Sequence, residues 1–438
     1  MAKHLKEGGA PWLHIACLKG WYVLAGNLMD AGADPLELAP NQTSALDRAI
    51  MVGEITIAKS MLERGMNAAT HRSALQNALH WVVRAQSMDA IKLLVEYGVD
   101  INVHDQSGWP PLQLLISNGV DIKDIKWMLE HGADPNARND SKGRTALHTA
   151  TGVDDVPIMR LLMEHGAKVE VADWEGRTSL HASSMLRHLA AIQFLIDNGA
   201  DIEAQEHDHR RRAIHHAALG GDVDMAKALV AGGADVDAQQ DGGRRALHHA
   251  LVQGHEDIVR FLIDAGVDVN AQDDDGHAPI HLSANYGPLS VLELLTECGA
   301  DLHAKHETGW TALHFASSTG ENDIVDRLLA RGLNVNERCL CGGTPLRVAT
   351  RKGHASTVRL LLSRGADADI SGGGQGGVDA WTPLFVASRN GNYAIVEILL
   401  EHGVDVNAVT HDGYTALTEA ILQGHERVAS FLTAYATR

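Results

Sequence analysis

The chain has little of what most secreted, membrane or aromatic-cored proteins depend on. Aromatic residues make up 4% of its 438 residues, and it has four cysteines, Cys17, Cys298, Cys339 and Cys341. So few cysteines in so long a chain exclude a disulfide framework and indicate a reducing compartment. The shortage of aromatic residues favours many small Ala, Leu and Val layers over one large core.

Long apolar runs and basic charge are also scarce. No apolar run reaches the 18 residues typical of a membrane span, and the N-terminal segment MAKHLKEGGAPW lacks the apolar core of a signal peptide. Lys and Arg number 37 against 56 Asp and Glu, a formal net charge of -19. Non-specific nucleic-acid binding depends on neutralising phosphates. We therefore predict no nucleic-acid partner, no direct membrane insertion and a cytoplasmic or nuclear location.

The chain does contain a sequence pattern that repeats at a nearly constant interval. The stretch Arg245 to Asn270, RRALHHALVQGHEDIVRFLIDAGVDVN, contains two apolar segments with helical spacing, closed by Gly254 and Gly266. One such helix pair cannot bury its own apolar face, so it needs neighbours stacked on both sides. The equivalent of Gly266 recurs in steps of 33 or 34 residues, with one step of 38, at positions 32, 65, 98, 132, 166, 199, 233, 299, 332, 365 and 403.

The phrase that opens each unit recurs as well. It reads NALH at Asn77 to His80, TALH at Thr145 to His148, TSLH at Thr178 to His181 and TALH at Thr311 to His314. With a mid-unit Gly-His and a closing Gly-Ala-Asp, this resembles the ankyrin repeat, over residues 11 to about 436, as thirteen copies. The resemblance implies an all-α solenoid of stacked helix-turn-helix units, with short β-hairpin fingers between units and a concave groove. A finger here is the segment that joins the second helix of one repeat to the first helix of the next.

The regularity of the repeats predicts the domain organisation. Residues 1–10 are a lead-in, 11–142 hold the degenerate repeats 1 to 4, 143–343 hold repeats 5 to 10, and 344–438 hold repeats 11 to 13. Repeat 2 has Asp47 where histidine is expected, and repeat 3 has Gln86 where a helix-ending glycine is expected. The Gly-rich insertion 371–379 lengthens one finger beside the expected binding edge. A tolerated loop insertion is the alternative reading.

One finger position gives the best indication of function. The residue before each opening phrase lies on a finger, on the side that the resembled family uses for binding. Arginine suits carboxylate partners and Trp and Tyr are enriched in binding hot spots, so we predict a partner protein or peptide with an acidic and an apolar segment. Stacking of these side chains on neighbouring fingers is the alternative. The predicted binding residues, including the adjacent second arginines, are Trp109, Arg144, Arg177, Arg211, Arg212, Arg244, Arg245, His277, Trp310, Trp381 and Tyr414.

The 26 histidines raise the question of a metal or a catalytic centre. Eight of them are the last residue of the opening phrase, which we call the LH position. The resemblance implies that these histidines make hydrogen bonds to neighbouring turns: His14, His80, His148, His181, His215, His248, His281 and His314. Stacking would bring His216 near His249. His303, His306, Cys339 and Cys341 lie on successive fingers, but C-x-C is less typical of zinc than C-x2-4-C. The sequence contains no HExxH, no Gly-rich phosphate loop and no G-x-S-x-G. We therefore predict no cofactor and no enzyme.

The sequence as a whole predicts a non-catalytic interaction scaffold or adaptor. Two alternatives stay open. One is a metal-binding or enzymatic protein that uses His216, His249, His306 and Cys339. The other is a substrate-recruiting subunit of a larger complex such as a ubiquitin ligase, although no recognisable adaptor-box helix follows repeat 13.

Overall fold

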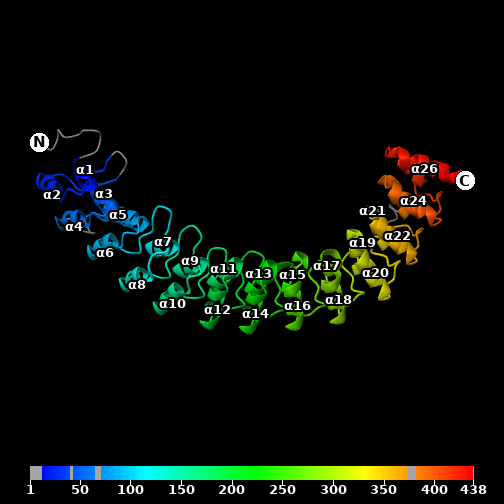
Figure 1. Cartoon of the computed structure of the whole chain (residues 1–438), viewed down its shortest axis with the longest axis horizontal. Coiled ribbons are helices and arrows are strands. Elements are labelled where there is room, and N and C mark those ends of the chain that lie inside the picture. Colours follow the sequence, from blue (N-terminus) through cyan, green and yellow to red (C-terminus); the bar gives the residue numbers. More distant parts are fainter. Residues whose placement is uncertain (1–11, 40–42, 65–70, 373–380, 438) are drawn as a thin grey trace. The chain divides into compact units, whose positions relative to one another are not determined.

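The computed structural model describes residues 12–39, 43–64, 71–372 and 381–437, which form twenty-six α-helices and one short 3-10 helix (Figure 1). The helices come as thirteen successive pairs, so the all-helical fold and the thirteen repeats are confirmed. The predicted lead-in 1–10 and residues 373–379 of the Gly-rich insertion lie outside the described residues. The chain forms two compact units, residues 1–208 and 209–438.

The first unit holds repeats 1 to 6. Its odd-numbered helices pack on one another in order, and each also packs on its even-numbered partner. The helices are α1 (Trp12–Leu18), α2 (Tyr22–Asp30), α3 (Ala45–Val52), α4 (Ile55–Glu63), α5 (Arg72–Arg84), α6 (Met88–Glu96), α7 (Pro111–Ser117), α8 (Ile122–Glu130), α9 (Ala146–Gly152), α10 (Val156–Glu164), α11 (Ser179–Leu186) and α12 (Leu189–Asp197).

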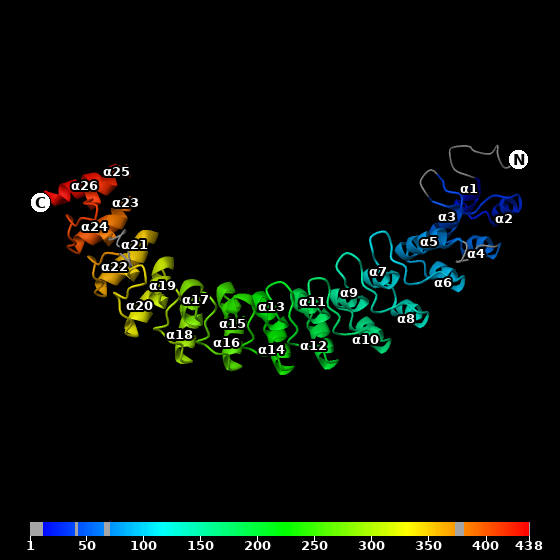
Figure 2. The same cartoon turned by 180° about the vertical axis from the view of Figure 1, so that it is seen from behind.

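The second unit holds repeats 7 to 13 in the same arrangement, with the odd and even helices in two parallel rows (Figure 2). No helix among the described residues is both long and apolar enough to cross a membrane. The helices are α13 (Ala213–Gly220), α14 (Val223–Ala231), η1 (Asp241–Gly243), α15 (Ala246–Gln253), α16 (Glu256–Asp264), α17 (Pro279–Tyr286), α18 (Leu289–Glu297), α19 (Ala312–Thr319), α20 (Asn322–Ala330), α21 (Pro345–Lys352), α22 (Ala355–Ser363), α23 (Pro383–Arg389), α24 (Tyr393–Glu401), α25 (Ala416–Leu422) and α26 (Glu426–Ala436).

The LH histidine joins the start of its helix to the next finger. In α9 the Nδ1 of His148 accepts the backbone N–H of the N-cap residue Thr145 at 3.2 Å, and its Nε2–H donates to the carbonyl of Arg177 at 2.9 Å. His248 bonds to the carbonyl of His277 at 3.1 Å and His314 to that of Gly343 at 3.2 Å in the same way. The predicted role of these histidines is thereby confirmed, and it satisfies a helix-terminal N–H that would otherwise lack a partner.

The mid-repeat Gly-His is a second joint between repeats. Gly320 ends α19 with a φ of +84°, and the ring of His354 lies so close that a Cβ on this glycine would meet Nδ1 at 2.7 Å. The Nε2–H of His354 donates to the carbonyl of Ser318 at 3.0 Å. Glycine is therefore required here both for the left-handed backbone and for the approach of the next repeat.

The fingers differ from the expected β-hairpins. Within the described ranges there is no β-strand, and the ladder-type pairing is limited to one isolated bridge between Val409 and Thr415. A typical finger is a turn in which Asp173 N donates to the carbonyl of Arg177 at 2.8 Å, while Trp174 N donates to Lys142 of the preceding finger at 2.8 Å. One such bond between neighbouring fingers is too few to make a strand ladder.

Repeat 3 departs from the pattern at its start. Its first helix, α5, has thirteen residues and begins at Arg72, five residues before the predicted opening at Asn77. The turn that a finger would place before the opening phrase is thus wound into helix. His80 lies in the middle of α5 and, within the described residues, makes neither of the two hydrogen bonds that His148 makes, so its predicted role in tying repeats together was wrong.

Candidate partner-binding surface

Several of the described finger turns are closed by one buried acceptor side chain, that of Asp105, Asn139, Asp173 or Asp273. In the finger before α11, Asp173 Oδ1 accepts the backbone N–H groups of Glu175 and Arg177, at 3.0 and 2.9 Å. Its second oxygen, Oδ2, accepts Nε of Arg144 from the preceding finger at 3.4 Å. The carboxylate therefore closes its own turn and also holds an arginine from the previous repeat.

Arg144, Arg177, Arg211 and Arg244 each donate through Nε to a side chain on the next finger. In the first unit, Nε of Arg177 donates to Glu206 at 2.9 Å. In the second unit, Nε of Arg244 donates to Asp273 at 3.3 Å, and Nε of Arg211 to the amide oxygen of Gln240 at 3.3 Å. In every pair the acceptor follows the arginine by 29 residues. The arginines thus cross-link consecutive fingers, which is the contact that the stacking alternative expected.

The cross-link uses only part of each guanidinium. The side chains of Arg144 and Arg244 are 36% and 40% exposed, whereas their acid partners are 1% exposed. Within the part of the chain that the structure describes, the Nη groups of Arg144 and Arg244 have no hydrogen-bond partner. The buried acid therefore fixes the plane of the guanidinium and leaves its outer donors available to a ligand.

Hydrogen bonds within the turn keep Asp273 ionised. Burial alone would raise the pKa of Asp273, but hydrogen bonds from the ring and the backbone N–H of His277 lower it to about 2. The same carboxylate is paired with Arg244 at 3.3 Å. It therefore stays charged across the physiological range, and the arginine stays oriented.

The predicted aromatic residues form clusters with their own first helices. The ring centroid of Trp310 lies 5.1 Å from that of Phe315 in an edge arrangement and 6.0 Å from that of His314. Trp381 lies 5.1 Å from Phe385, with the guanidinium of Arg389 4.6 Å from its ring.

The remaining predicted residues divide into two groups. His277 is half-buried against His306, with 4.2 Å between ring centroids, while Tyr414 is 45% exposed. Arg212 precedes α13 and donates to the carbonyl of Gln239 on the next finger at 2.7 Å, whereas Arg245 precedes α15 and donates to the carbonyl of Asp237 in its own finger at 3.1 Å. Trp109 is also half-buried.

Two exposed apolar side chains at finger tips were not predicted. Trp174 is 56% exposed with the guanidinium of Arg138 4.9 Å from its ring, and Leu340 is 72% exposed. Both follow the turn acceptor directly in the sequence, a position that is charged or polar in most other fingers, including Asp140, His207 and Asp274. A comparison of this one position through all repeats could have found them.

The candidate metal ligands do not come together as one site. Cys339 Sγ accepts the N–H of Gly343 at 3.2 Å, in the role that Asp173 has elsewhere, and lies 2.7 Å from the Sγ of Cys341. The Nδ1 of His306 bonds to its neighbour Thr308. Among the described residues, no group of three or more ligand atoms includes His303, His306, Cys339 or Cys341.

Two other groups of histidine and acid have structural explanations. The described residues contain one set of three potential ligands within 4.8 Å of one another, Asp273, Asp275 and His277, and it is the closed finger turn itself. His215, which bonds to the carbonyl of Ala238 at 3.0 Å, lies with its ring centroid 6.1 Å from that of His249.

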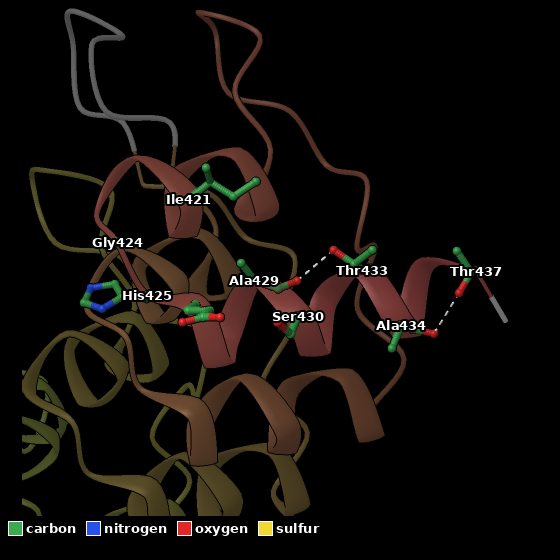
Figure 3. Close-up of a pocket in the computed structure, with 9 residues that line it drawn as sticks. Ile421, Gly424, His425, Ala429, Ser430, Thr433, Ala434 and Thr437 are labelled. Carbon is green, nitrogen blue, oxygen red and sulfur yellow. Dashed lines mark hydrogen bonds between the residues drawn. The ribbon is translucent and has the colours of Figure 1, made fainter.

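The last repeat presents a hollow of about 630 Å³ along α25 and α26. Figure 3 shows Ile421 and His425 at one end and the hydroxyl of Thr433 turned onto the carbonyl of Ala429, at 2.8 Å. The described residues that line this hollow include no cluster of charged side chains and none of the predicted binding residues.

Comparison with known proteins agrees with this architecture. A family model described as ankyrin repeats in three copies matches residues 66–139, 121–206, 203–273, 280–372 and 369–437, most of the chain. The chain belongs to the ankyrin-repeat family. Ankyrin repeats are protein-interaction modules, so a general role in binding proteins follows from the family.

Individual relatives match parts of this ankyrin-repeat chain. Human protein phosphatase 1 regulatory subunit 27 is 40% identical over 104 residues, 23% of the chain and 65% of that protein. The mouse B-cell lymphoma 3 protein homolog is 29% identical over 160 residues, 35% of each chain. The human ASB11 ankyrin repeat domain is similar in structure, with a TM-score of 0.46 and 27% identity over 51% of this chain and 98% of that one. The first two matches span less than two thirds of either relative.

Proposed function

We propose that this ankyrin-repeat protein is a non-catalytic scaffold or adaptor of the cytoplasm or nucleus, which binds a partner protein or peptide across its fingers and first helices. The proposal depends on Arg144 and Arg244, whose Nε groups donate to a buried acid while their Nη groups have no hydrogen-bond partner among the described residues. A guanidinium fixed in this way loses little conformational freedom on binding, which favours affinity. Its partner at these fingers is an acidic segment.

The aromatic fingers of the second unit extend the surface with a different chemistry. Trp310 and Trp381 offer half-buried rings that pack on Phe315 and Phe385 of their own repeats, and Tyr414 offers an exposed ring. Such supported rings bury apolar area at low entropic cost and are frequent hot spots. The matching part of the partner is apolar.

We expect Arg144→Ala and Arg244→Ala each to weaken partner binding by about 1–3 kcal/mol, and the loss to shrink at high salt. Trp310→Ala is expected to weaken binding by a similar amount with little dependence on salt. The partner is obtained by affinity capture from native cell extract and mass spectrometry. Binding of the purified pair is then measured by calorimetry at low and high salt.

A matched control distinguishes a direct contact between Arg144 and the partner from an effect of Arg144 on the stability of the fold. Asp173→Asn removes the internal charge partner of Arg144 but keeps an acceptor for the turn, as Asn139 does in its own finger at 3.0 and 3.2 Å. If Arg144 contacts the partner, Asp173→Asn should bind nearly as well as the unaltered protein. Equal losses in both variants would mean that the arginine acts through the fold alone.

A further inference from the structure

Side chains two residues apart converge at the tips of neighbouring fingers in the second unit. In the finger before α17, carboxylate oxygens of Asp273 and Asp275 lie within 4.8 Å of each other. In the next finger, before α19, the Nδ1 of His306 lies 2.9 Å from the hydroxyl oxygen of Thr308. In both fingers the turn therefore brings these two positions together, although the chemistry of the side chains differs.

In the following finger, before α21, both of these positions are cysteines. By the 33-residue period they are Cys339 and Cys341. Their Sγ atoms lie 2.7 Å apart, and the Sγ of Cys339 also accepts the backbone N–H of Gly343 at 3.2 Å. The S–S distance of a disulfide is about 2.0 Å, so a small movement of one side chain separates this pair from a covalent bond.

Gly343 leaves room for the two sulfur atoms. In other fingers the residue directly before the opening phrase has a large side chain, such as that of Arg244 or Trp310. A Cβ on Gly343 would lie 3.3 Å from the Sγ of Cys339 and 3.5 Å from the Sγ of Cys341. A large side chain at this position would therefore crowd both sulfur atoms, and the glycine belongs to the same arrangement as the cysteines.

The two thiols differ in access and in ease of ionisation. Cys339 is 5% exposed, whereas Cys341 is an exposed residue. Burial opposes ionisation of Cys341, but hydrogen bonds from the neighbouring thiol and from the N–H of Gly343, together with the charge of Arg347, lower its pKa. Burial raises the pKa of Cys339. An oxidant in solution therefore reacts with Cys341, and Cys339 is placed to attack the product from within the chain.

We propose that Cys339 and Cys341 form a reversible dithiol–disulfide pair that exchanges with a low-molecular-weight disulfide such as oxidised glutathione. The thiolate of Cys341 attacks one glutathione sulfur, which forms a mixed disulfide and releases one glutathione thiolate. Cys339 gives its proton to that thiolate and attacks the Sγ of Cys341, which forms the internal disulfide and releases the second glutathione. The protein loses two electrons and two protons, and oxidised glutathione becomes two molecules of reduced glutathione.

Closure of this disulfide acts on the exposed tip of the finger. Leu340 lies between the two cysteines and is 72% exposed, and its N–H donates to the carbonyl of Thr308 at 2.9 Å. The ring therefore restrains the backbone that presents Leu340. Exposed disulfides are readily reduced, which suits a regulatory bond better than a structural one. This inference goes beyond the proposed function and does not depend on it.

The test equilibrates the full-length protein with mixtures of reduced and oxidised glutathione and then blocks the remaining thiols with N-ethylmaleimide. Trypsin cleavage after Arg338 and Arg347 gives one peptide, 339–347, that holds both cysteines. Mass spectrometry is expected to find this peptide unblocked and lighter by two hydrogens, and excess reduced glutathione is expected to reverse the change. Cys298, the other exposed cysteine, is expected to form only a mixed disulfide with glutathione.

Two variants, each shown to be folded by its thermal midpoint, separate the roles of the thiols. Cys339→Ser lacks the attacking thiol, so the mixed disulfide on Cys341 should rise about tenfold above its level in the unaltered protein. Cys341→Ser should leave the buried Cys339 unmodified.

A synthetic peptide of residues 339–347 tests whether the finger itself favours closure. Because the free chain is not held in the turn, it should need about tenfold more oxidised glutathione for half closure. The proposal is overturned if the unaltered protein stops at the mixed disulfide, or if Cys339 reacts with glutathione in folded Cys341→Ser. It is also overturned if the peptide closes as readily as the protein.

Discussion

Lowering the pH from 7.5 to 4 is expected to destabilise the second unit strongly, because its buried histidines are held in the neutral form. Burial is the main cause that lowers the pKa of His215 and His314 to about 4 and that of His249 to about 3. Nearby His215, Arg211 and Arg244 oppose the charged form of His249 further. These histidines lie within one stack of repeats, so their effects add along the unit.

The sign of the change in stability with pH follows from the histidine pKa values in the folded and unfolded chain. In the unfolded chain these histidines protonate near 6.5, and in the folded chain near 3 to 4. Their contribution to stability is therefore complete above pH 6.5 and is lost as the pH falls toward 4. For His314 the shift corresponds to about 3 kcal/mol. Protonation would also remove the Nδ1 acceptor that caps α19 through Thr311 N, at 3.2 Å.

The chain contains its own control for this experiment. Gln113 occupies the histidine position of repeat 4 and donates through Nε2 to the carbonyls of Ala137 and Arg144, both at 2.8 Å. His314→Gln should thus keep the link to the next finger without titrating. We expect it to lie within about 1 kcal/mol of the unaltered protein at pH 7.5 and to be the more stable protein at pH 4.5. Urea unfolding followed by circular dichroism measures both, and parallel pH profiles would contradict the explanation.

Asp273→Ala is expected to destabilise the second unit by about 3–5 kcal/mol at pH 7.5, the typical cost of removing one partner from a buried charged network. The substitution leaves the backbone N–H groups of Asp275 and His277 without the acceptor that closes the turn, at 3.2 and 2.8 Å. It also leaves Arg244 without its carboxylate. Urea unfolding gives the loss, and hydrogen exchange at the amides of Asp275 and His277 shows whether the turn opens.

Asp273→Asn separates the turn from the charge. Asn139 shows that an amide oxygen closes such a turn, since it accepts the N–H groups of Lys142 and Arg144. Gln240 likewise shows that an amide can receive the arginine of the preceding finger. We expect Asp273→Asn to cost about 1–2 kcal/mol. Equal costs for the Ala and Asn variants would show that closure of the turn contributes nothing.

The sequence was sufficient for the features that depend on spacing alone. The glycine period predicted thirteen helix pairs, and the LH phrase predicted the bonds of His148, His248 and His314. Features that depend on how a side chain is oriented could not be predicted. The Nε bond of Arg144 to Asp173 joins residues of different repeats, and a period places both on fingers without showing which atoms meet.

The sequence shows where repeats depart from the period, but not what each departure does to the structure. Asp47 was recognised as a substitution for histidine, yet its consequence depends on α5 starting at Arg72. That start depends on whether residues 72–76 form a finger turn or wind into helix, a local choice that the phrase at Asn77 obscured.

The 29-residue spacing between arginine and acid has a consequence for how such a protein can gain or lose repeats. Residues 145–177 form one complete repeat that begins after Arg144 and ends with Arg177. If this repeat were excised, Arg144 would take the place of Arg177 and face Glu206. Each of the modules between Arg144 and Arg244 carries an acceptor for the module before it and a donor for the module after it, so it can be deleted or duplicated without leaving this arginine unmatched. In this part of the array the number of repeats can therefore change while the chemistry of the junctions is preserved.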